Sequence, residues 1–550
     1  MRFSRRVHLP LLVRVLVAFF TATVFQPDEY FQALEPAYRV VFGYGHLTWE
    51  WTSANPIRSI LYPAVNIPIY WLLKETGLHD SGVLGDWLII GGPRILHGLL
   101  AALTDISLCS LTRRVVGERY VDTALLLSLT SLFHALSLSR SLSNSLETSL
   151  ATIAFAHYPW SIGPDFALDR SQLRRVLLFA ALACAVRPTH AIIWVYLFGY
   201  LLWLLRTSFS SCIAVVQDAI LIGVFSLGGL FVLDTWYYGQ PTLTPLNFLL
   251  TNASNVSLFY GGNPWHFYVS QALPILCTTA LPFVLHQAWR ILAGHESRAL
   301  NAMLGCITWT VGVYSLARHK EWRFIHPLLP LLHLFAAKSF NDIAAGKPAA
   351  FVRRMRIFLL LTLPASLYVV LLYCSGPIDV MAFLRSLPRA DLESGGIGFL
   401  MPCHSTPGQA YLHRPELTNG KTWALGCEPP LQNENLSTYR DQTTVFFKSP
   451  HGYLTARFPS AVDPAFPPSA FPASVPGTRD AEAYAWRHAW PLHLVFFGAL
   501  LEAEGVRDLL EQRGYRQVWA GGRWWEGDSD ERKGGVRVWR YNIGNTSSPS

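Results

Sequence analysis

The chain has 550 residues, of which 51% are hydrophobic and only 15% are charged. A soluble domain has about 25% charged residues, so this composition excludes an ordinary soluble protein and favours one embedded in a membrane. The formal net charge of +8 is scattered between apolar segments and forms no basic patch, so we expect no nucleic-acid partner.

The first predicted element is an apolar stretch over about 8–25, which follows Arg2, Arg5 and Arg6. It resembles a signal peptide, but no small-residue cleavage site follows it, so we expect a retained membrane anchor. The positive-inside rule places the N-terminus in the cytoplasm.

Ten further apolar segments predict a polytopic α-helical membrane protein with about eleven transmembrane helices. They lie near residues 87–112, 120–138, 143–158, 174–189, 190–205, 212–233, 269–291, 299–317, 322–338 and 357–374. Lys and Arg concentrate in alternate connections, which we assign to the cytoplasm. The odd number of spans then places the C-terminal region, and the loops 26–86 and 234–268, in the lumen of the endoplasmic reticulum.

The composition changes at about residue 375. Residues 1–375 are predicted to form the multi-span catalytic domain, whereas residues 376–550 are polar and rich in Pro, Gly and Trp. The second part ends in alternating strand-like and helical runs, which predicts a small lumenal α/β domain. These runs lie near residues 493–498, 502–513, 515–520 and 536–541, the second being the helix.

Two features of the chain fit the lumen. Asn-X-Ser/Thr sequons on the predicted lumenal side are glycosylation candidates, at Asn252, Asn255, Asn435 and Asn545. Cys403 and Cys427 lie in the polar C-terminal region. An oxidising compartment allows them to form a disulfide, and two free thiols remain the alternative.

Two adjacent carboxylates, Asp28 and Glu29, follow the first span. Pro27 before them is typical of a helix start, where acidic residues face the positive end of the helix dipole. That structural role is compatible with a chemical one, because a carboxylate held beside an apolar wall is well placed to act as a base. The aromatic remainder of the loop, 33–59, resembles an interfacial helix that shapes a groove for a lipid-linked or glycan ligand.

Several ionisable residues lie within or at the ends of spans. A charge within a membrane span costs free energy, so each such residue is a candidate functional residue. They are Arg94, Asp105, Glu147, Arg187 and Asp234. We assign Arg94, Glu147, Arg187 and Asp234 to the lumenal ends and Asp105 to a deeper position. A structural Arg94–Asp105 ion pair is the alternative for these two residues.

The segment 318–323 places three firm cations and His319 between two apolar spans, on the side where the charge rule disfavours cations. Binding of a phosphate by Lys320 and Arg323 at the membrane surface is a natural reason, because both offer charge-assisted donors. The alternative is that the predicted topology is wrong and that this segment lies on the cytoplasmic side. Trp265, His266 and Tyr268 suit sugar stacking or an ordinary interfacial belt. No metal-binding motif stands out.

Four motifs together resemble those of glycosyltransferase family 22, which are mannosyltransferases of the endoplasmic reticulum with the GT-C fold. The motifs are Pro27-Asp28-Glu29, Asn144-Ser-Leu-Glu147-Thr148, Arg187-Pro188-Thr189 and His319-Lys320-Glu321-Trp322-Arg323-Phe324. Within the family, the stretches 44–51, 260–268 and 399–407 are most similar to members that extend glycosylphosphatidylinositol (GPI) precursors.

The resemblance implies a reaction. The donor would be dolichol-phosphate mannose, and the acceptor would be a GPI precursor with two mannoses that gains a third in α-1,2 linkage. It implies inversion, with Asp28 or Glu29 as the base and no metal or other cofactor. His319, Lys320, Arg323 and Arg187 would bind the donor phosphate. Expected substrate-binding residues are Glu147, Asp234, Trp265, His266, Tyr268, Glu321 and Arg94.

Two alternative functions remain open. A sister mannosyltransferase of the N-glycan or later GPI pathway would share the same motifs and differ in its acceptor. A lipid or solute transporter would also explain buried charges, but it predicts related halves with sites at the midplane. The motifs here gather at one face of the membrane instead.

Overall fold

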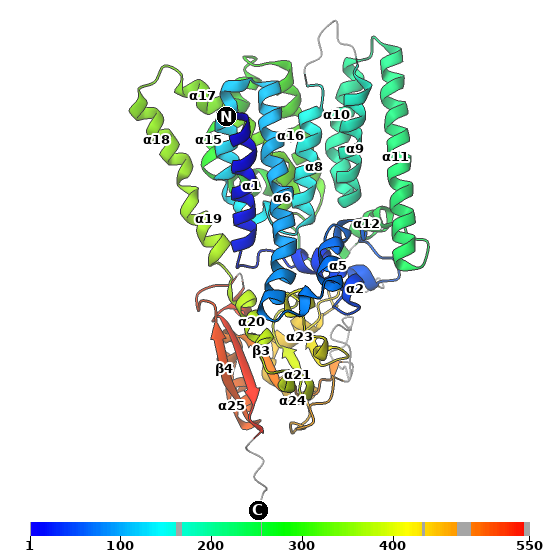
Figure 1. Cartoon of the computed structure of the whole chain (residues 1–550), viewed down its shortest axis with the longest axis vertical. Coiled ribbons are helices and arrows are strands. Elements are labelled where there is room, and N and C mark those ends of the chain that lie inside the picture. Colours follow the sequence, from blue (N-terminus) through cyan, green and yellow to red (C-terminus); the bar gives the residue numbers. More distant parts are fainter. Residues whose placement is uncertain are drawn as a thin grey trace, which may run out of the picture.

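The computed structural model describes residues 2–160, 168–254, 256–431, 435–469, 486–527 and 529–543. Two of the predicted glycosylation sites, Asn255 and Asn545, lie outside the described residues. The chain forms a bundle of helices at one end and a region built on a β-sheet at the other, with short helices between them (Figure 1).

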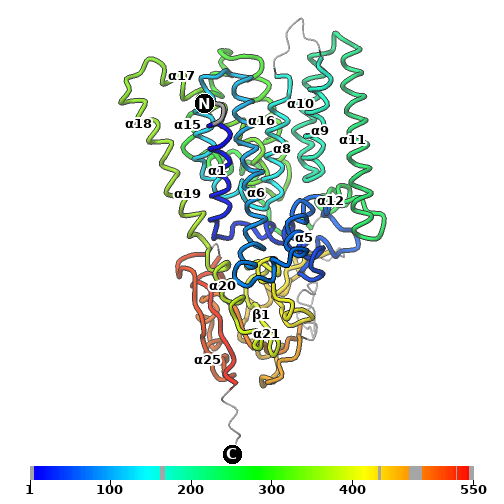
Figure 2. Tube along the Cα trace, in the orientation of Figure 1, coloured from blue at the N-terminus to red at the C-terminus, as the bar shows by residue number. Residues whose placement is uncertain are grey.

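The bundle consists of helices that run alongside one another (Figures 1 and 2). A helix satisfies its own backbone hydrogen bonds, which an apolar surrounding requires, so these long apolar runs form helices. The helices are α1 (Arg2–Phe20), α6 (Val83–Val115), α7 (Val121–Leu129), α8 (Ser143–His157), α9 (Arg170–Val186), α10 (Ala191–Leu204), α11 (Phe209–Tyr238), α14 (Leu273–Cys277), α15 (Leu281–Leu292), α16 (Arg298–Leu316), α17 (Leu329–Ala344), α18 (Ala349–Leu360) and α19 (Thr362–Leu371).

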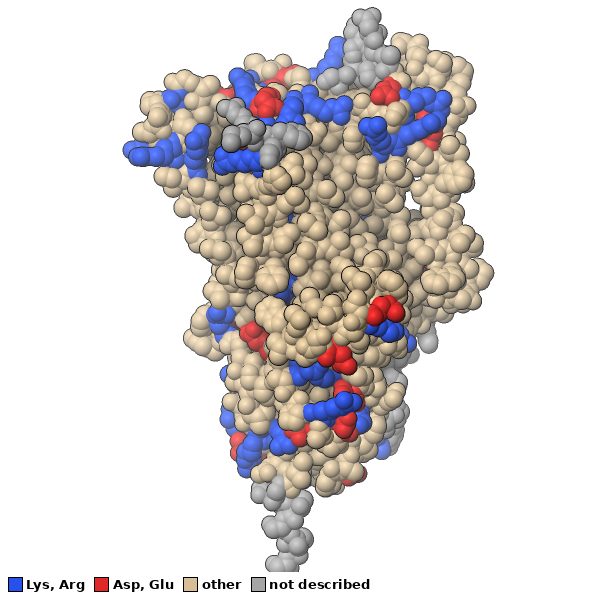
Figure 3. Space-filling model, viewed as in Figure 1, with Lys and Arg blue, Asp and Glu red and all other residues tan. Residues whose placement is uncertain are grey.

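Several helical stretches qualify as membrane spans. Among the described residues, five are long and apolar enough to cross a bilayer: Val83–Val115, Phe209–Tyr238, Tyr268–Leu292, Arg298–Leu316 and Ala349–Arg385. Figure 3 shows a belt with almost no charge between two charged zones, as a membrane-embedded surface requires. The number of about eleven spans stays a prediction, because other bundle helices are short or interrupted by π-helical turns.

A buried ion pair joins α1 to α6. Arg14 Nε donates to Asp105 Oδ2 at 2.7 Å, and Ser128 Oγ donates to Asp105 Oδ1 at 2.6 Å. The alternative of an Arg94–Asp105 pair is therefore wrong. These two residues are eleven positions apart on one helix, which separates them by about 16 Å along its axis.

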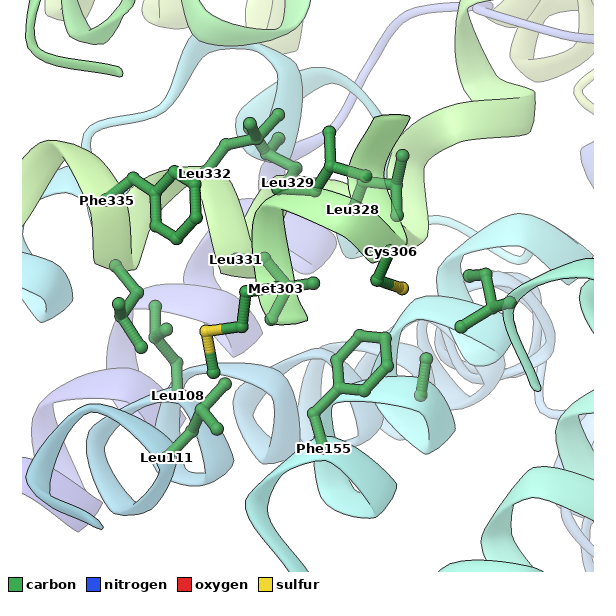
Figure 4. Close-up of a cluster of buried hydrophobic side chains, with 14 of the residues drawn as sticks. Leu108, Leu111, Phe155, Met303, Cys306, Leu328, Leu329, Leu331, Leu332 and Phe335 are labelled. Atoms are coloured by element: carbon green, nitrogen blue, oxygen red, sulfur yellow. The ribbon is translucent and has the colours of Figure 1, made fainter. Parts of the chain in front are cut away.

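The bundle core is apolar and continuous from helix to helix. Figure 4 shows Leu108, Phe155, Met303, Cys306 and Leu331 converging from α6, α8, α16 and α17. Side chains packed this closely tolerate little displacement. The core therefore fixes the helix ends from which the polar residues of the site project.

The sheet has five strands in the order β2-β1-β3-β5-β4. β1 is parallel to β2 and β3, whereas β5 is antiparallel to β3 and β4. Strands lie at the three predicted strand-like runs, and β1 and β2 are additional. Their three residues each are too few to show a periodic pattern. The strands are β1 (Ile397–Phe399), β2 (Thr422–Ala424), β3 (His493–Phe497), β4 (Tyr515–Gly521) and β5 (Val536–Tyr541).

The two faces of the sheet pack against different partners. Val495 and Phe497 join a cluster with Tyr30 and Tyr38 from the segment after α1, whereas Leu494 packs with helices beyond the opposite face. Alternation along a strand explains this division. Packing against this face therefore positions the segment after α1 between the bundle and the sheet.

Short helices complete the layer between bundle and sheet and surround the sheet. They are α2 (Glu35–Phe42), α3 (Trp49–Thr52), α4 (Leu61–Ala64), α5 (Ile67–Glu75), α12 (Thr244–Ala253), α13 (Val256–Phe259), α20 (Gly376–Arg385), α21 (Arg389–Ser394), α22 (Gln409–Leu412), α23 (Gln442–Lys448), α24 (Pro450–Arg457) and α25 (Val506–Gln512). The predicted domain boundary at residue 375 falls between α19 and α20.

Candidate active site

A pocket of about 360 Å³ lies where the end of the bundle meets the sheet region. Its size falls within the range of small-molecule sites, about 300–1,000 Å³. Separate parts of the chain supply its titratable lining residues, which are Asp28, Glu50, Arg58, Arg187, Tyr260, His319, Glu321, Arg323 and His404. The pocket is therefore a product of the whole fold, and we call it the catalytic pocket.

Asp28 faces this pocket at the start of a helical turn, where the backbone N–H of Tyr30 donates to the carbonyl of Pro27 at 3.0 Å. Its Oδ2 accepts from Arg323 Nη1 at 2.6 Å. Within the described chain, no residue donates to Oδ1 of Asp28. That oxygen is available to a ligand.

Glu29 points elsewhere although it is the next residue. Its side chain is buried, and its Oε2 accepts from Arg140 Nη1 at 3.1 Å. Arg140 also donates to the carbonyl and the hydroxyl of Thr23, at 2.5 and 2.6 Å. Arg140 was not predicted as a site residue, although a lone Arg between two apolar spans was a usable signal.

A chain of charges continues from Asp28. Arg323 Nε donates to Glu321 Oε2 at 2.7 Å, and His319 Nε2 lies 3.2 Å from Glu321 Oε1. The hydrogen bond to Glu321 raises the pKa of His319. Burial acts to raise the pKa of Glu321, but Arg323 and His319 hold it below its ordinary value. This pairing favours the cationic form of His319 at the pocket surface.

Lys320 lies beside this chain and is directed away from it. Its Nζ donates to the carbonyl of Asn263 at 2.9 Å, and the Asn263 side chain donates to the carbonyl of Lys320 at 2.8 Å. The side chain is buried and does not line the catalytic pocket. In the described chain, Lys320 therefore ties the 261–263 loop to the cationic segment.

Arg187 supplies a second guanidinium to the pocket. Its Nε lies 3.2 Å from Glu147 Oε2, its Nη1 donates to Ser143 Oγ at 3.1 Å, and its plane covers the Phe324 ring. Glu147 is 1% exposed and also contacts His190 Nδ1 at 2.9 Å. Glu147 thus lies behind Arg187 and orients it.

Two other predicted residues hold the surrounding structure. Asp234 accepts from the hydroxyls of Ser59 and Thr244, at 2.8 and 2.6 Å, and so ties α11 to the loop before α4. Arg94 donates to the carbonyl of Phe19 at 3.3 Å and lies over the ring of Tyr411. Neither lines the catalytic pocket.

The aromatic segment 265–268 does not converge on the pocket. Trp265 is 75% exposed, His266 Nδ1 contacts Ser270 Oγ at 2.8 Å, and Tyr268 is buried in the bundle. Of the two sequons described, Asn252 is exposed and lines the pocket, whereas Asn435 is exposed away from it.

The pocket also contains groups that were not predicted as site residues. Arg58 Nη2 donates to Glu50 Oε1 at 2.6 Å, and Trp49 Nε1 donates to the hydroxyl of Tyr260 at 3.0 Å. The aromatic loop 33–59 had been interpreted as a groove former. The sequence signal for these groups is the presence of two charged residues, Glu50 and Arg58, in a loop that is rich in tryptophan.

His404 enters the pocket from the loop after β1. Its ring lies 4.7 Å from that of Phe31, centroid to centroid. A disulfide joins Cys403 to Cys427, with Cα atoms 5.9 Å apart, and so resolves the two alternatives for these cysteines. Cys403, His404 and Cys427 lie close enough to hold a metal ion. The disulfide, however, leaves no thiolate for this purpose.

Together these residues place one available carboxylate oxygen in the same pocket as Arg187, His319 and Arg323. A carboxylate suits removal of a proton from a hydroxyl, and guanidinium and imidazolium groups suit a departing phosphate. This arrangement is suited to transfer of a group to a hydroxyl with departure of a phosphate.

The fold has the GT-C architecture of a solved membrane protein. The structure is similar to that of ArnT from Cupriavidus metallidurans bound to undecaprenyl phosphate, with a TM-score of 0.57 over 99% of this chain and 98% of that one. Sequence identity between the two is 12%, so this likeness concerns the fold alone.

The profile of the Alg9-like mannosyltransferase family matches residues 7–413, and the chain belongs to this family. It is 35% identical to GPI alpha-1,2-mannosyltransferase 3 of Mus musculus, over 82% of this chain and 78% of the mouse protein. It is 34% identical to GPI mannosyltransferase 3 of Debaryomyces hansenii, over 82% of this chain and 80% of the yeast protein. The resemblance to a mannosyltransferase family is thus confirmed.

Proposed function

We propose that the chain transfers mannose from dolichol-phosphate mannose to a GPI precursor that carries two mannoses, and forms an α-1,2 linkage. The names of the relatives support the acceptor and the linkage. The observation that carries the chemistry is the placement of Asp28 Oδ1 in one pocket with Arg187, His319 and Arg323.

Asp28 is the base in this mechanism. Its Oδ1 takes the proton of the acceptor hydroxyl as the hydroxyl oxygen attacks C1 of the donor mannose. The bond from C1 to the phosphate oxygen breaks, and its electron pair leaves with dolichyl phosphate. Attack opposite to the leaving group converts a β-linked donor into an α-linked product. Glu29 is unsuited to this role because its side chain is buried beside Arg140 and does not line the catalytic pocket.

The leaving phosphate is stabilised by cations of the chain. Arg187 and His319 contact it, while Arg323 orients Asp28 and holds the base on one side of the sugar. Charge-assisted donors can stabilise this developing charge without a metal ion. We therefore expect transfer to continue in the presence of EDTA.

The active site faces the lumen of the endoplasmic reticulum in this proposal. The opposite end of the bundle carries the ion pairs of Arg6 with Asp122, Arg170 with Asp218 and Lys338 with Asp342. The zone of Lys and Arg at that end is visible in Figure 3. Cations concentrate on the cytoplasmic side of membrane proteins, so the catalytic pocket lies on the lumenal side.

The test is Asp28→Asn in microsomes supplied with radiolabelled dolichol-phosphate mannose and the two-mannose GPI precursor. We expect transfer to fall by about 10²–10⁴-fold, the usual contribution of a general base. The amide retains the shape of the side chain and can still accept from Arg323, so the protein should insert and fold. Asp508→Asn on the exposed surface of α25 is the matched control.

Normal transfer by Asp28→Asn would remove Asp28 as the base. The wild-type chain could instead fail to extend the two-mannose precursor and transfer mannose to an N-glycan precursor or to a three-mannose GPI precursor. That result would show that the proposed acceptor is wrong. Identifying the lipid intermediate that accumulates in cells lacking the protein checks the same point.

A further inference from the structure

A second pocket, of about 330 Å³, adjoins the catalytic pocket. Phe31 and His404 line both of them, so the two pockets meet at these two side chains. None of the predicted site residues that the structure describes lines the second pocket. We call it the sheet pocket, because strands β1 and β2 end in its wall.

The sheet pocket lies at the carboxyl ends of two parallel strands. Phe399 ends β1, Ala424 ends β2, and both residues and the loops that follow them line the pocket. In open α/β sheets, ligands bind in crevices outside the carboxyl ends of strands. The loops that follow β1 and β2 are therefore in a position to contact a ligand.

A buried carboxylate holds the walls of this pocket together. Glu35 is fully buried, and its Oε1 accepts from the backbone N–H of Ala410 at 2.6 Å. Its Oε2 accepts from the backbone N–H of His46 at 3.1 Å. The loop that carries His46 and the short helix α22 that carries Ala410 are thereby joined through one side chain.

The neighbouring glycines leave room for that carboxylate. A Cβ on Gly408 would lie 2.5 Å from Glu35 Oε1, and a Cβ on Gly45 would lie 3.0 Å from Glu35 Oε2. Gly45 also has φ of +140°, which disfavours other residues. Both glycines line the sheet pocket, so its walls are shaped around Glu35.

The lining suits an uncharged, hydroxyl-rich ligand. Tyr44 and Trp423 are among its lining residues, and Thr406 and Gln409 add hydroxyl and amide groups. Among the described lining residues, Arg39 is the one Lys, Arg, Asp or Glu, and its Nη1 donates to the carbonyl of Gly45 at 3.2 Å.

The histidines of the lining add no charge. Burial lowers the pKa of His46 and that of His404 to about 4. Both rings are therefore neutral at the pH of the cell, and each offers a donor and an acceptor. A phosphate would find Arg39 alone as a charged partner here, whereas the catalytic pocket offers several cations.

We propose that the sheet pocket binds the mannose-bearing glycan of the acceptor, next to the sugar whose hydroxyl is extended. This inference rests on the proposed function and assigns its acceptor subsite. The reacting mannose lies beside Asp28 in the catalytic pocket, and the preceding part of the glycan passes Phe31 and His404 into the sheet pocket.

His404 is the positioning residue at this passage. Its backbone has φ of +57°, an unusual conformation for a residue other than glycine, and the adjacent Cys403 is anchored to Cys427. Its ring packs on Phe31, which also packs edge-on to His46. The passage is thus built from three aromatic rings held by a disulfide and by Glu35.

The test uses the full-length membrane protein with Thr406→Trp, which fills the sheet pocket, and Thr406→Val, which removes one hydroxyl at constant size. The control is Thr455→Trp, at an exposed position of α24. KM is measured separately for the two-mannose GPI precursor and for dolichol-phosphate mannose. We expect Thr406→Trp to raise the acceptor KM at least tenfold and Thr406→Val to raise it about threefold, with the donor KM within twofold of wild type.

An unchanged acceptor KM in Thr406→Trp would overturn the inference, as would an equal rise in both KM values. If the tryptophan variant fails to fold, the valine variant decides: a rise in acceptor KM alone supports the subsite, and no rise overturns it. Failure of the proposed function is distinguishable, because the wild-type protein would then not extend this precursor at all.

Discussion

At the scale of single residues, the structure assigns different surroundings to two adjacent carboxylates. Sequence alone predicts that Asp28 and Glu29 begin a helical turn, but it cannot say which one meets a ligand. That depends on Arg323 and Arg140, which lie 295 and 111 residues away in the chain. The same limit applies to Lys320, whose charge suggested a phosphate although its Nζ is directed to a backbone carbonyl.

Glu29→Gln tests this division of roles. The substitution leaves the Arg140 charge buried without its partner, so we expect a loss of stability of about 3–5 kcal/mol. Transfer per folded molecule should fall much less than in Asp28→Asn. Thermal unfolding of the purified protein in detergent and kcat on the folded fraction measure the two effects.

Glu511→Gln, at an exposed position of α25, is the control for the Glu29 variant. The opposite pattern would contradict the assignment. A Glu29→Gln protein with wild-type stability and no transfer would make Glu29, and not Asp28, the base.

At the scale of elements, the loops around the sheet pocket depend on two connections that sequence alone did not predict or resolve. The pairing of Cys403 with Cys427 was one of two open alternatives, and the Glu35 contacts with His46 and Ala410 were not predicted. The periodicity of a sequence reports which face of an element is buried. It does not report which loops meet, because those contacts depend on the packing of both elements.

The Glu35 connection predicts a pH dependence of stability. Burial raises the pKa of Glu35 from 4.5 to about 7, so the folded protein binds this proton more tightly than the unfolded chain does. Stability from this group is greatest below about pH 4.5, falls as the pH rises to about 7, and then levels off. The shift corresponds to roughly 3 kcal/mol.

Glu35→Gln isolates this contribution. The amide does not titrate, so the difference in Tm between wild type and variant should change between pH 5 and pH 8 in favour of the variant. Burial also raises the pKa of Glu428 to about 7, but that group is present in both proteins and cancels. A pH-independent difference in Tm would contradict the prediction.

The disulfide has its own expected effect. It closes a loop with a sequence separation of 24, so its loss should cost about 3 kcal/mol. We expect the Cys403→Ser, Cys427→Ser double variant to unfold at lower temperature and to show a higher acceptor KM, since His404 is no longer anchored. Cys212→Ser, at a free cysteine, is the control. Equal Tm values for the double variant and wild type would contradict this account.

At the scale of the whole molecule, sequence predicted the class of fold better than its assembly. Apolar runs from the N-terminus to about residue 374 are enough to indicate a helical membrane protein. Their number is harder to predict, because the helix α7 in the span predicted over 120–138 ends at Leu129 and is followed by a separate π-helical turn at His134–Leu138. The catalytic pocket needs the 26–60 segment, α12 and the loop after β1 together.

The orientation of the whole molecule yields the last prediction. If the catalytic pocket and the sheet region face the lumen, Asn435 is exposed to the glycosylation machinery at a distance from the substrate. Asn252 would face the same compartment, but it lines the catalytic pocket, and a glycan there would obstruct substrate entry. We therefore expect the active enzyme to carry a glycan at Asn435 and none at Asn252.

Endoglycosidase treatment of microsomal protein measures this outcome as a shift in electrophoretic mobility. Asn435→Gln should reduce the shift by the mass of one glycan, and Asn252→Gln should leave it unchanged. Protease protection provides an independent check: a tag after the sheet region should be protected in sealed microsomes, and a tag before α1 should be digested. Digestion of the tag beyond the sheet would place the pocket in the cytosol and would contradict the prediction. The positive-inside rule and the disulfide in the sheet region both favour the lumen.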